Sequence, residues 1–143
     1  MKRIFLLAAG GLCGLFLLVA GKEALFGDPQ IQVERQFVQD LPQLTKSAQA
    51  ILSGEEMSPP EGWEAGAFEG TVCFDYGGRG IGSATSYWGV CYVPEDEPVG
   101  FQGLSMEEAV LQGDGWLWEE QDGDNRCYVQ RLAPCWYYFK MDF

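Results

Sequence analysis

The chain has 143 residues, a formal net charge of −12 and no histidine. Without histidine it cannot build Ser-His or Cys-His nucleophile pairs, and the commonest ligand of catalytic zinc is missing. From residue 22 onward, seven basic residues accompany 21 acidic ones, which gives a net charge of −14. Such a negative surface repels phosphate backbones, so nucleic acid is not an expected partner.

An uncharged run of 18 residues, Ile4 to Gly21, follows the cations Lys2 and Arg3. This length is near the lower limit for crossing a hydrocarbon core of about 30 Å, and the positive-inside rule keeps both cations in the cytoplasm. We therefore expect residues 1–26 to be a signal anchor that crosses the cell membrane once through residues 4–21. The C-terminal domain then lies outside, as in a bacterial-type envelope protein. The alternative is secretion after signal cleavage.

Two glycines in this run, Gly10 and Gly14, have the spacing that lets transmembrane helices approach closely. A homodimer through this helix face is one interpretation, and the common use of glycine in such helices is the other. Nothing else in the sequence bears on the oligomeric state.

Residues 27–62 are predicted to form a helical membrane-proximal segment and linker. Asp28-Pro29 is typical of an N-cap followed by proline in the first helical turn. Apolar residues then recur at helical spacing: Leu41, Leu44, Ala48, Ile51 and Leu52. The pattern predicts two helices, or one helix kinked at Pro42. The alternative is that Ile31–Val33 begins a strand.

Residues 63–143 change to glycine, aromatic and β-branched residues, which favour strands. We expect an α+β fold, in which the N-terminal transmembrane helix and the helical segment precede a small antiparallel β-rich domain. An all-β two-layer domain is the alternative. A short strand at Val99–Phe101 and a short helix at Ser105–Gln112 are also expected. The main strands are predicted at Thr71–Tyr76, Tyr87–Val93, Trp116–Gln121, Arg126–Leu132 and Cys135–Phe143.

Tight turns at residues 122–125 and 133–134 would place the last three strands in a defined register. Side chains alternate across a sheet, so one face would then carry a row of large rings and an arginine. An exposed aromatic surface of this kind stacks on sugar rings or contacts a protein. The predicted binding residues are Trp116, Trp118, Arg131, Trp136 and Tyr138. The alternative is that both faces are covered within the domain.

Four cysteines outside the apolar run permit two disulfides in any of three connectivities: Cys73, Cys91, Cys127 and Cys135. A hairpin that pairs Cys73 with Cys91 also aligns apolar neighbours, so this bridge is favoured. The tight-turn register puts Cys127 and Cys135 on opposite faces, and their bridge would need a bulge or a wider loop. Four buried thiols are the alternative. No Cys-x-x-Cys pair exists, and we expect no metal and no cofactor.

The run Gly77-Gly78-Arg79-Gly80-Ile81-Gly82 resembles a phosphate-binding loop only superficially, because another strand, not a helix, is predicted after it. It is interpreted as a mobile hairpin loop whose glycine content would suit contact with a ligand.

No motif assigns catalytic residues. The function expected is a non-catalytic binding or interaction module outside the cell membrane, with a glycan or a protein as ligand. The alternative is a hydrolase that acts on envelope or polysaccharide material through acidic residues. A hydrolase would show a concave pocket with two facing carboxylates, one of them with a raised pKa. A binding module would show an aromatic patch without such a pair.

Overall fold

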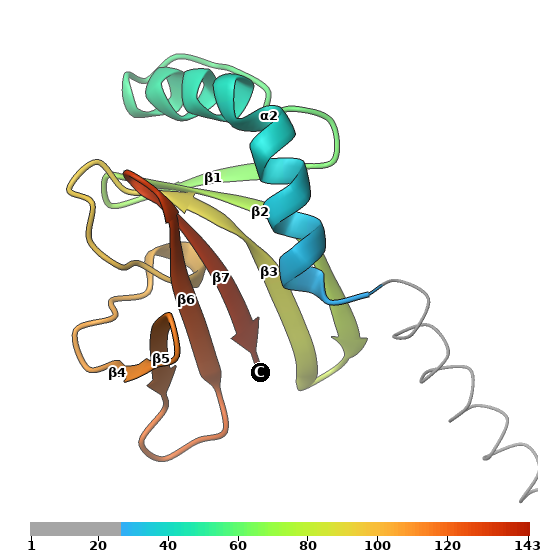
Figure 1. Ribbon diagram of the computed structural model, residues 1–143, viewed down its shortest axis with the longest axis vertical. Coiled ribbons are helices and arrows are strands. Elements are labelled where there is room, and N and C mark those ends of the chain that lie inside the picture. The colour runs from blue at the N-terminus through green and yellow to red at the C-terminus, as the bar shows by residue number, and fades with distance from the viewer. Residues whose placement is uncertain (1–26) are drawn as a thin grey trace, which may run out of the picture. The chain divides into compact units, whose positions relative to one another are not determined.

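The computed structural model describes residues 27–143, and residues 33–143 form one compact unit. The predicted membrane segment, residues 4–21 with Gly10 and Gly14, lies outside the described residues. Between residues 27 and 143, no helix is both long enough and apolar enough to cross a bilayer. The unit is a small antiparallel β-rich domain with one α-helix (Figure 1).

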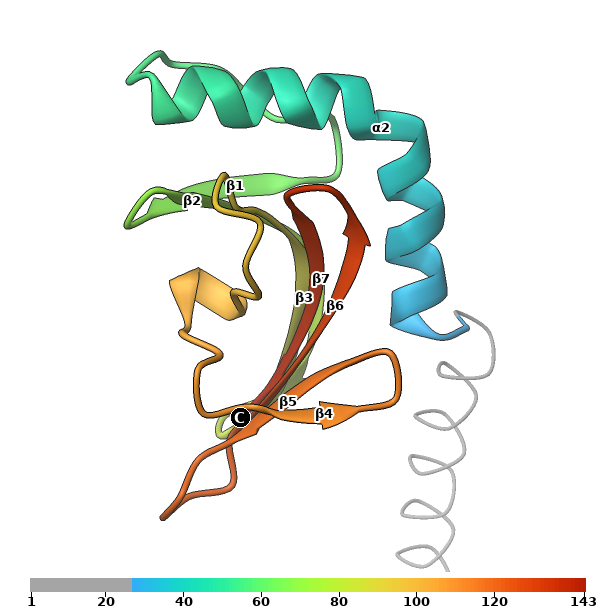
Figure 2. The same ribbon diagram turned by 60° about the vertical axis from the view of Figure 1, so that its left-hand side comes forward.

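The helix α2 (Pro29–Leu52) is a single element with Pro42 inside it. The Asp28 carboxylate accepts a hydrogen bond of 2.9 Å from the Gln30 amide, as the N-cap prediction required. Proline removes one intrahelical hydrogen bond and bends the axis, and the bend is visible in Figure 2. One kinked helix is therefore correct, and the alternatives of two helices and of a strand at Ile31–Val33 are wrong.

Seven strands form one antiparallel sheet in the order β1-β2-β3-β7-β6-β5-β4. Residues 93–109 carry the chain from β3 to the far edge, and the last four strands return until β7 lies beside β3. A 3₁₀ turn, η1 (Phe101–Gly103), lies on this crossing. The strands are β1 (Glu64–Phe68), β2 (Thr71–Ile81), β3 (Ala84–Tyr92), β4 (Val110–Gln112), β5 (Gly115–Glu119), β6 (Arg126–Ala133) and β7 (Trp136–Asp142).

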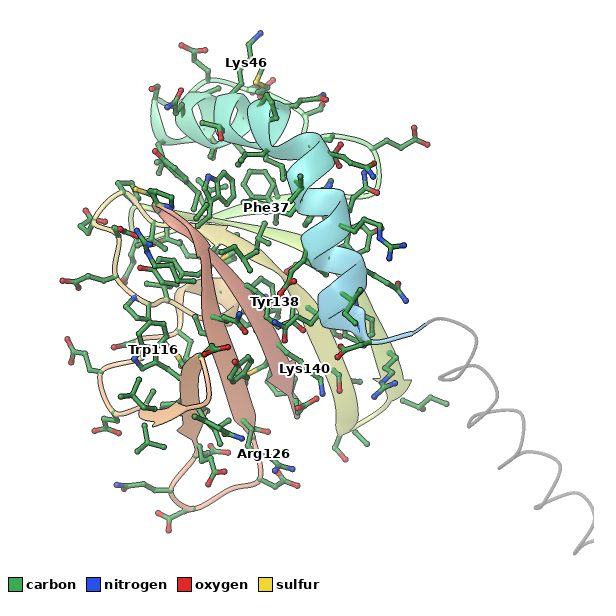
Figure 3. All side chains as sticks on the ribbon, in the orientation of Figure 1. Phe37, Lys46, Trp116, Arg126, Tyr138 and Lys140 are labelled. Carbon is green, nitrogen blue, oxygen red and sulfur yellow. A yellow bond between two sulfur atoms is a disulfide. The ribbon has the colours of Figure 1, made fainter. Side chains whose placement is uncertain are left out.

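One face of the sheet packs against α2, and we call it the helix-covered face. Phe37 and Trp136 meet edge to face here, with ring centroids 5.4 Å apart. In Figure 3, Phe37 and Tyr138 lie on the α2 side of β6 and β7, and Trp116 lies on the other side. The core of this face is Val33, Phe37, Leu44, Ala48, Trp63, Val72, Phe74, Val90, Trp136 and Tyr138.

The opposite face is covered by the crossing segment, residues 93–109, and we call it the loop-covered face (Figure 2). Phe101 of η1 packs on Phe139, with centroids 5.7 Å apart. The Gly100 carbonyl oxygen lies 3.8 Å from the Cys73 sulfur and 3.6 Å from the Cys91 sulfur. The core of this face is Cys73, Cys91, Val93, Met106, Cys127, Val129, Tyr137, Phe139 and Met141. Both faces are therefore covered.

Both predicted turns differ from the structure. The turn before β6 is wider than residues 122–125, because Glu119 pairs with Arg126, and this shift of two residues leaves the faces unchanged. The register of β6 against β7 differs from the predicted one by a single residue. Pro134 and Cys135 are the two central residues of the turn, because Ala133 pairs with Trp136, and Leu132 is an extra residue on β6. Since side chains alternate, a slip of one residue exchanges the two faces of a strand. Trp136 therefore lies on the helix-covered face, not beside Trp116.

Three further expectations need correction. The segment Ser105–Gln112 is not a helix: the Ser105 hydroxyl accepts the Glu107 amide at 3.4 Å in a local turn, and β4 follows. The glycine-rich run is not a loop, because β2 continues to Ile81 and turns at residues 82–83. The short strand expected at Val99–Phe101 is reduced to an isolated bridge between Val99 and Ser105. In addition, the sequence did not predict β1.

Cys73 and Cys91 form a disulfide between directly paired positions of β2 and β3, as predicted. Cys127 and Cys135 are free thiols, so the second bridge does not form. Cys127 is buried on the loop-covered face, where burial raises its pKa to about 11. Cys135 lies in the β6–β7 turn with its sulfur 3.7 Å from the Pro94 carbonyl oxygen.

The disulfide closes a loop with a sequence separation of 18 residues. Restricting the unfolded chain by a loop of this size contributes about 3 kcal/mol. We predict that replacing both Cys73 and Cys91 by alanine lowers the free energy of unfolding by about that amount, measured by chemical denaturation. The Cys135→Ala variant, which removes a free thiol, should unfold like the wild type. A double variant as stable as the wild type would contradict the bridge.

Candidate functional site

The five predicted binding residues do not share one surface. Trp136 and Tyr138 are buried beneath α2, with 3% and 1% of their surface exposed. Trp116 and Trp118 are half-buried on the loop-covered face, where they pack against its core. The predicted platform is therefore divided between the two faces by the register of β7.

The fifth of these residues, Arg131, is held by Asp96. Its guanidinium donates to the two Asp96 carboxylate oxygens at 3.2 and 2.6 Å. The same carboxylate accepts the Cys135 amide at 2.8 Å and the Tyr137 hydroxyl at 3.0 Å. The Arg131 hydrogen bond, followed by that from Cys135, lowers the pKa of Asp96 well below its usual range. This cluster, exposed at Arg131 and buried at Tyr137, fixes the β6–β7 turn.

A cavity of about 630 Å³ opens at the end of the loop-covered face that lies away from this cluster. Four segments meet there: the β2–β3 hairpin, η1, the β5–β6 turn and the residue after β7. The lining residues are Asp75, Gly82, Ser83, Thr85, Tyr87, Phe101, Gln102, Asp124, Asn125 and Phe143.

Glycines of β2 leave the space for this cavity. Tyr76 is an extra residue at a β-bulge, so beyond Asp75 the positions on the loop-covered face are Gly78 and Gly80, which pair with Tyr87 and Thr85. At Gly80, where φ is +119°, a Cβ would collide with the Ala84 carbonyl oxygen. β2 therefore has no side chains here that would fill the cavity beside the ring of Tyr87.

Asp75 is the polar group that this arrangement leaves without a partner. Its Oδ1 atom is buried and has no hydrogen-bond partner within residues 27–143. The reason lies in the strand pairing, because the residues opposite Asp75 are Glu64 on β1 and Gly89 on β3. A carboxylate and a glycine cannot donate a side-chain hydrogen bond. Burial, together with the charge of Glu64, raises the pKa of Asp75.

Three aromatic rings form a corner of the cavity. Tyr87 and Phe101 stack with centroids 5.4 Å apart and planes at 17°. The ring of Phe143 stands at 78° to both, at 6.1 and 5.8 Å. Tyr87 and Phe143 are 38% and 37% exposed, so the corner is open to solvent. Such rings stack on apolar or planar groups and attract cations at their faces.

The charges at the cavity are of one sign. Its lining contains two carboxylates, Asp75 and Asp124, and no lysine or arginine. Among residues 27–143, no group of three or more metal-ligating side chains is placed to hold a metal ion. The arrangement can accept hydrogen bonds through Asp75 and stack a planar or apolar group on the rings.

No protein-family model matches the chain, and searches of curated proteins and of solved structures also find no match.

The sequence contained part of the information that leads to this site. Asp75 is the one charged residue of the predicted strand Thr71–Tyr76, and the Cys73 pairing places it on the disulfide side. The bulge at Tyr76 and the approach of residues 101 and 143 depend on tertiary structure, so the cavity itself could not be inferred.

We predict that Asp75→Asn stabilises the protein at pH 7. The folded pKa is above the unfolded value of 3.8, so the wild type loses stability as pH rises through the folded pKa. The variant avoids this loss, and its advantage should shrink as pH falls toward 3.8. We expect about 1 kcal/mol or less, since the side chain is only partly buried.

The measurement is denaturant unfolding of both chains from pH 3.5 to pH 8. Asp114→Asn, which removes the same charge at an exposed position outside the cavity, is the matched control. Asp75→Asn less stable than Asp114→Asn at pH 7 would show that the carboxylate has a structural partner.

Proposed function

We propose that the protein is a non-catalytic binding module on the outer side of the cell membrane, and that the cavity around Asp75 binds a small organic ligand. The observation that carries this proposal is the buried carboxylate oxygen without a partner. A fully buried acceptor without a partner costs about 1–3 kcal/mol, and the half-buried Asp75 carboxylate costs less than that. Ionisable groups whose pKa is shifted by burial concentrate at binding and catalytic sites, and Asp75, whose pKa is raised by burial, lines the cavity.

The rings beside Asp75 support binding as well. A planar or apolar part of a ligand can stack on Tyr87 and Phe143, while a donor group of the same ligand reaches Asp75. The hydroxyl and amide groups of Thr85 and Asn125 add further hydrogen-bonding positions. Cavities that combine apolar walls with a few convergent polar groups are typical of small-molecule sites.

The location outside the membrane is supported by two features. The cations Lys2 and Arg3 precede the apolar residues 4–21, and the Cys73–Cys91 disulfide is typical of an oxidising compartment. We propose that residues 4–21 remain as a single-pass anchor, with secretion after cleavage as the alternative. An alkaline phosphatase fused after residue 143 should be active, whereas activity only of a cytosolic reporter would contradict this location.

The hydrolase remains a second candidate because Glu64 lies directly opposite Asp75 across the strand pair, and the pKa of Asp75 is raised. A carboxylate pair with one raised pKa is the arrangement that glycoside hydrolysis uses. Glu64, however, does not line the cavity that Asp75 lines. Binding therefore accounts for the cavity with fewer assumptions.

The proposal is tested by a fragment screen on the full chain in detergent micelles, read by ¹H-¹⁵N NMR. We predict ligands that shift the amides of Thr85, Gln102 and Asn125, and that lose affinity for Asp75→Asn by at least tenfold, about 1.4 kcal/mol. The Asp114→Asn variant should bind them like the wild type.

The same samples are incubated with polysaccharide and peptidoglycan substrates. No turnover is expected. Turnover lost in both Asp75→Asn and Glu64→Gln would establish the hydrolase instead, and a screen without any cavity ligand would contradict the binding module.

A further inference from the structure

We propose that the ligand of the Asp75 cavity is an organic cation, a protonated amine on a flat or apolar body. This inference rests on the proposed function, because it specifies the ligand class of the same cavity. Three observations lead to it: the missing donor at Asp75, the uniform sign of the charges, and the geometry of the three rings.

The first observation is that, within residues 27–143, the Asp75 carboxylate lacks a hydrogen-bond donor at Oδ1. Asp75 Oδ1 is buried without a partner, and neither Glu64 nor Gly89, the residues opposite it in the sheet, can donate. A protonated amine carries up to three N–H donors. It also carries the opposite charge, so a protonated amine held against Asp75 at the cavity wall stabilises the charged form of this half-buried carboxylate.

The sign of the charges separates a cation from other ligands. Asp124 is a second carboxylate in the lining, where no lysine or arginine is present. An anion would meet like charge at both carboxylates. A neutral ligand, such as an unmodified sugar, could donate hydroxyl groups, but it would enclose the charge of Asp75 further without compensating it.

The ring geometry favours an amine attached to a larger body over a bare ion. Tyr87 stacks on Phe101, and Phe143 stands at 78° to both rings. Aromatic rings therefore form two walls of the cavity that are nearly perpendicular to each other. Ring faces attract ammonium groups and also pack against flat or apolar groups. A metal ion would instead require several oxygen ligands at close range, which these rings do not supply.

The test uses two pairs of probes that differ in the amine alone. Glucosamine is compared with glucose, and phenethylamine with 2-phenylethanol. Each is titrated by NMR into the full chain in detergent micelles at about 0.15 M salt, which screens the long-range charge of the domain. The two amines distinguish a sugar body from an aromatic body.

We expect at least one amine to shift the Thr85 and Asn125 amides with an affinity tenfold or more above that of its neutral partner. Asp75→Asn should abolish this preference. Asp114→Asn, whose net charge equals that of Asp75→Asn, should retain it. Because glucosamine does not partition into micelles, its result is independent of the detergent.

The possible failures are distinguishable. A neutral probe that binds as well as its amine would overturn the cation while leaving the binding module in place. Displacement of the amine by calcium at equal concentration would show an inorganic cation site. If no probe perturbs the cavity amides, and the fragment screen is also empty, the cation and the proposed function fail together.

Discussion

The Asp96 carboxylate joins three parts of the chain that set the register of the sheet. It accepts hydrogen bonds from Arg131 on β6, from the Cys135 amide in the turn and from the Tyr137 hydroxyl on β7. Cys135 adopts a φ of +67°, which a residue with a side chain rarely does, and the bond from its amide to Asp96 stabilises this conformation. The turn decides which side chains of β7 face α2.

Both faces of the sheet follow from this register. Trp136 and Tyr138 join α2 in one core, while Tyr137 and Phe139 join the crossing segment in the other. Both faces are covered within residues 27–143, and the cavity opens where the covering segment stops. That point lies beyond Asp75, where β2 presents glycines to the loop-covered face and leaves the carboxylate without a donor.

The sequence predicted most elements because their signals are local. The apolar stripe of α2 and the alternation in five strands depend on neighbouring residues, and the pairing of Cys73 with Cys91 depends on a single hairpin. The prediction of an aromatic platform was wrong because the register of β7 depends on the turn at Pro134 and on the extra residue Leu132. Asp96, which is distant in the sequence, stabilises this turn through the Cys135 amide. The cavity was missed for the same reason, since residues from four separate segments form it.

The central claim is that the half-buried carboxylate of Asp75, which lines the cavity, is where the charged group of a ligand binds. The most direct measurement is the pKa of the Asp75 carboxyl group, followed through the ¹³C resonance of its carboxyl carbon in the free chain and in the chain saturated with a bound amine. We predict a value above 3.8 in the free chain, and a fall when the amine binds and favours the charged form. A value at or below 3.8 in the free chain, or one that the amine leaves unchanged, would contradict the claim.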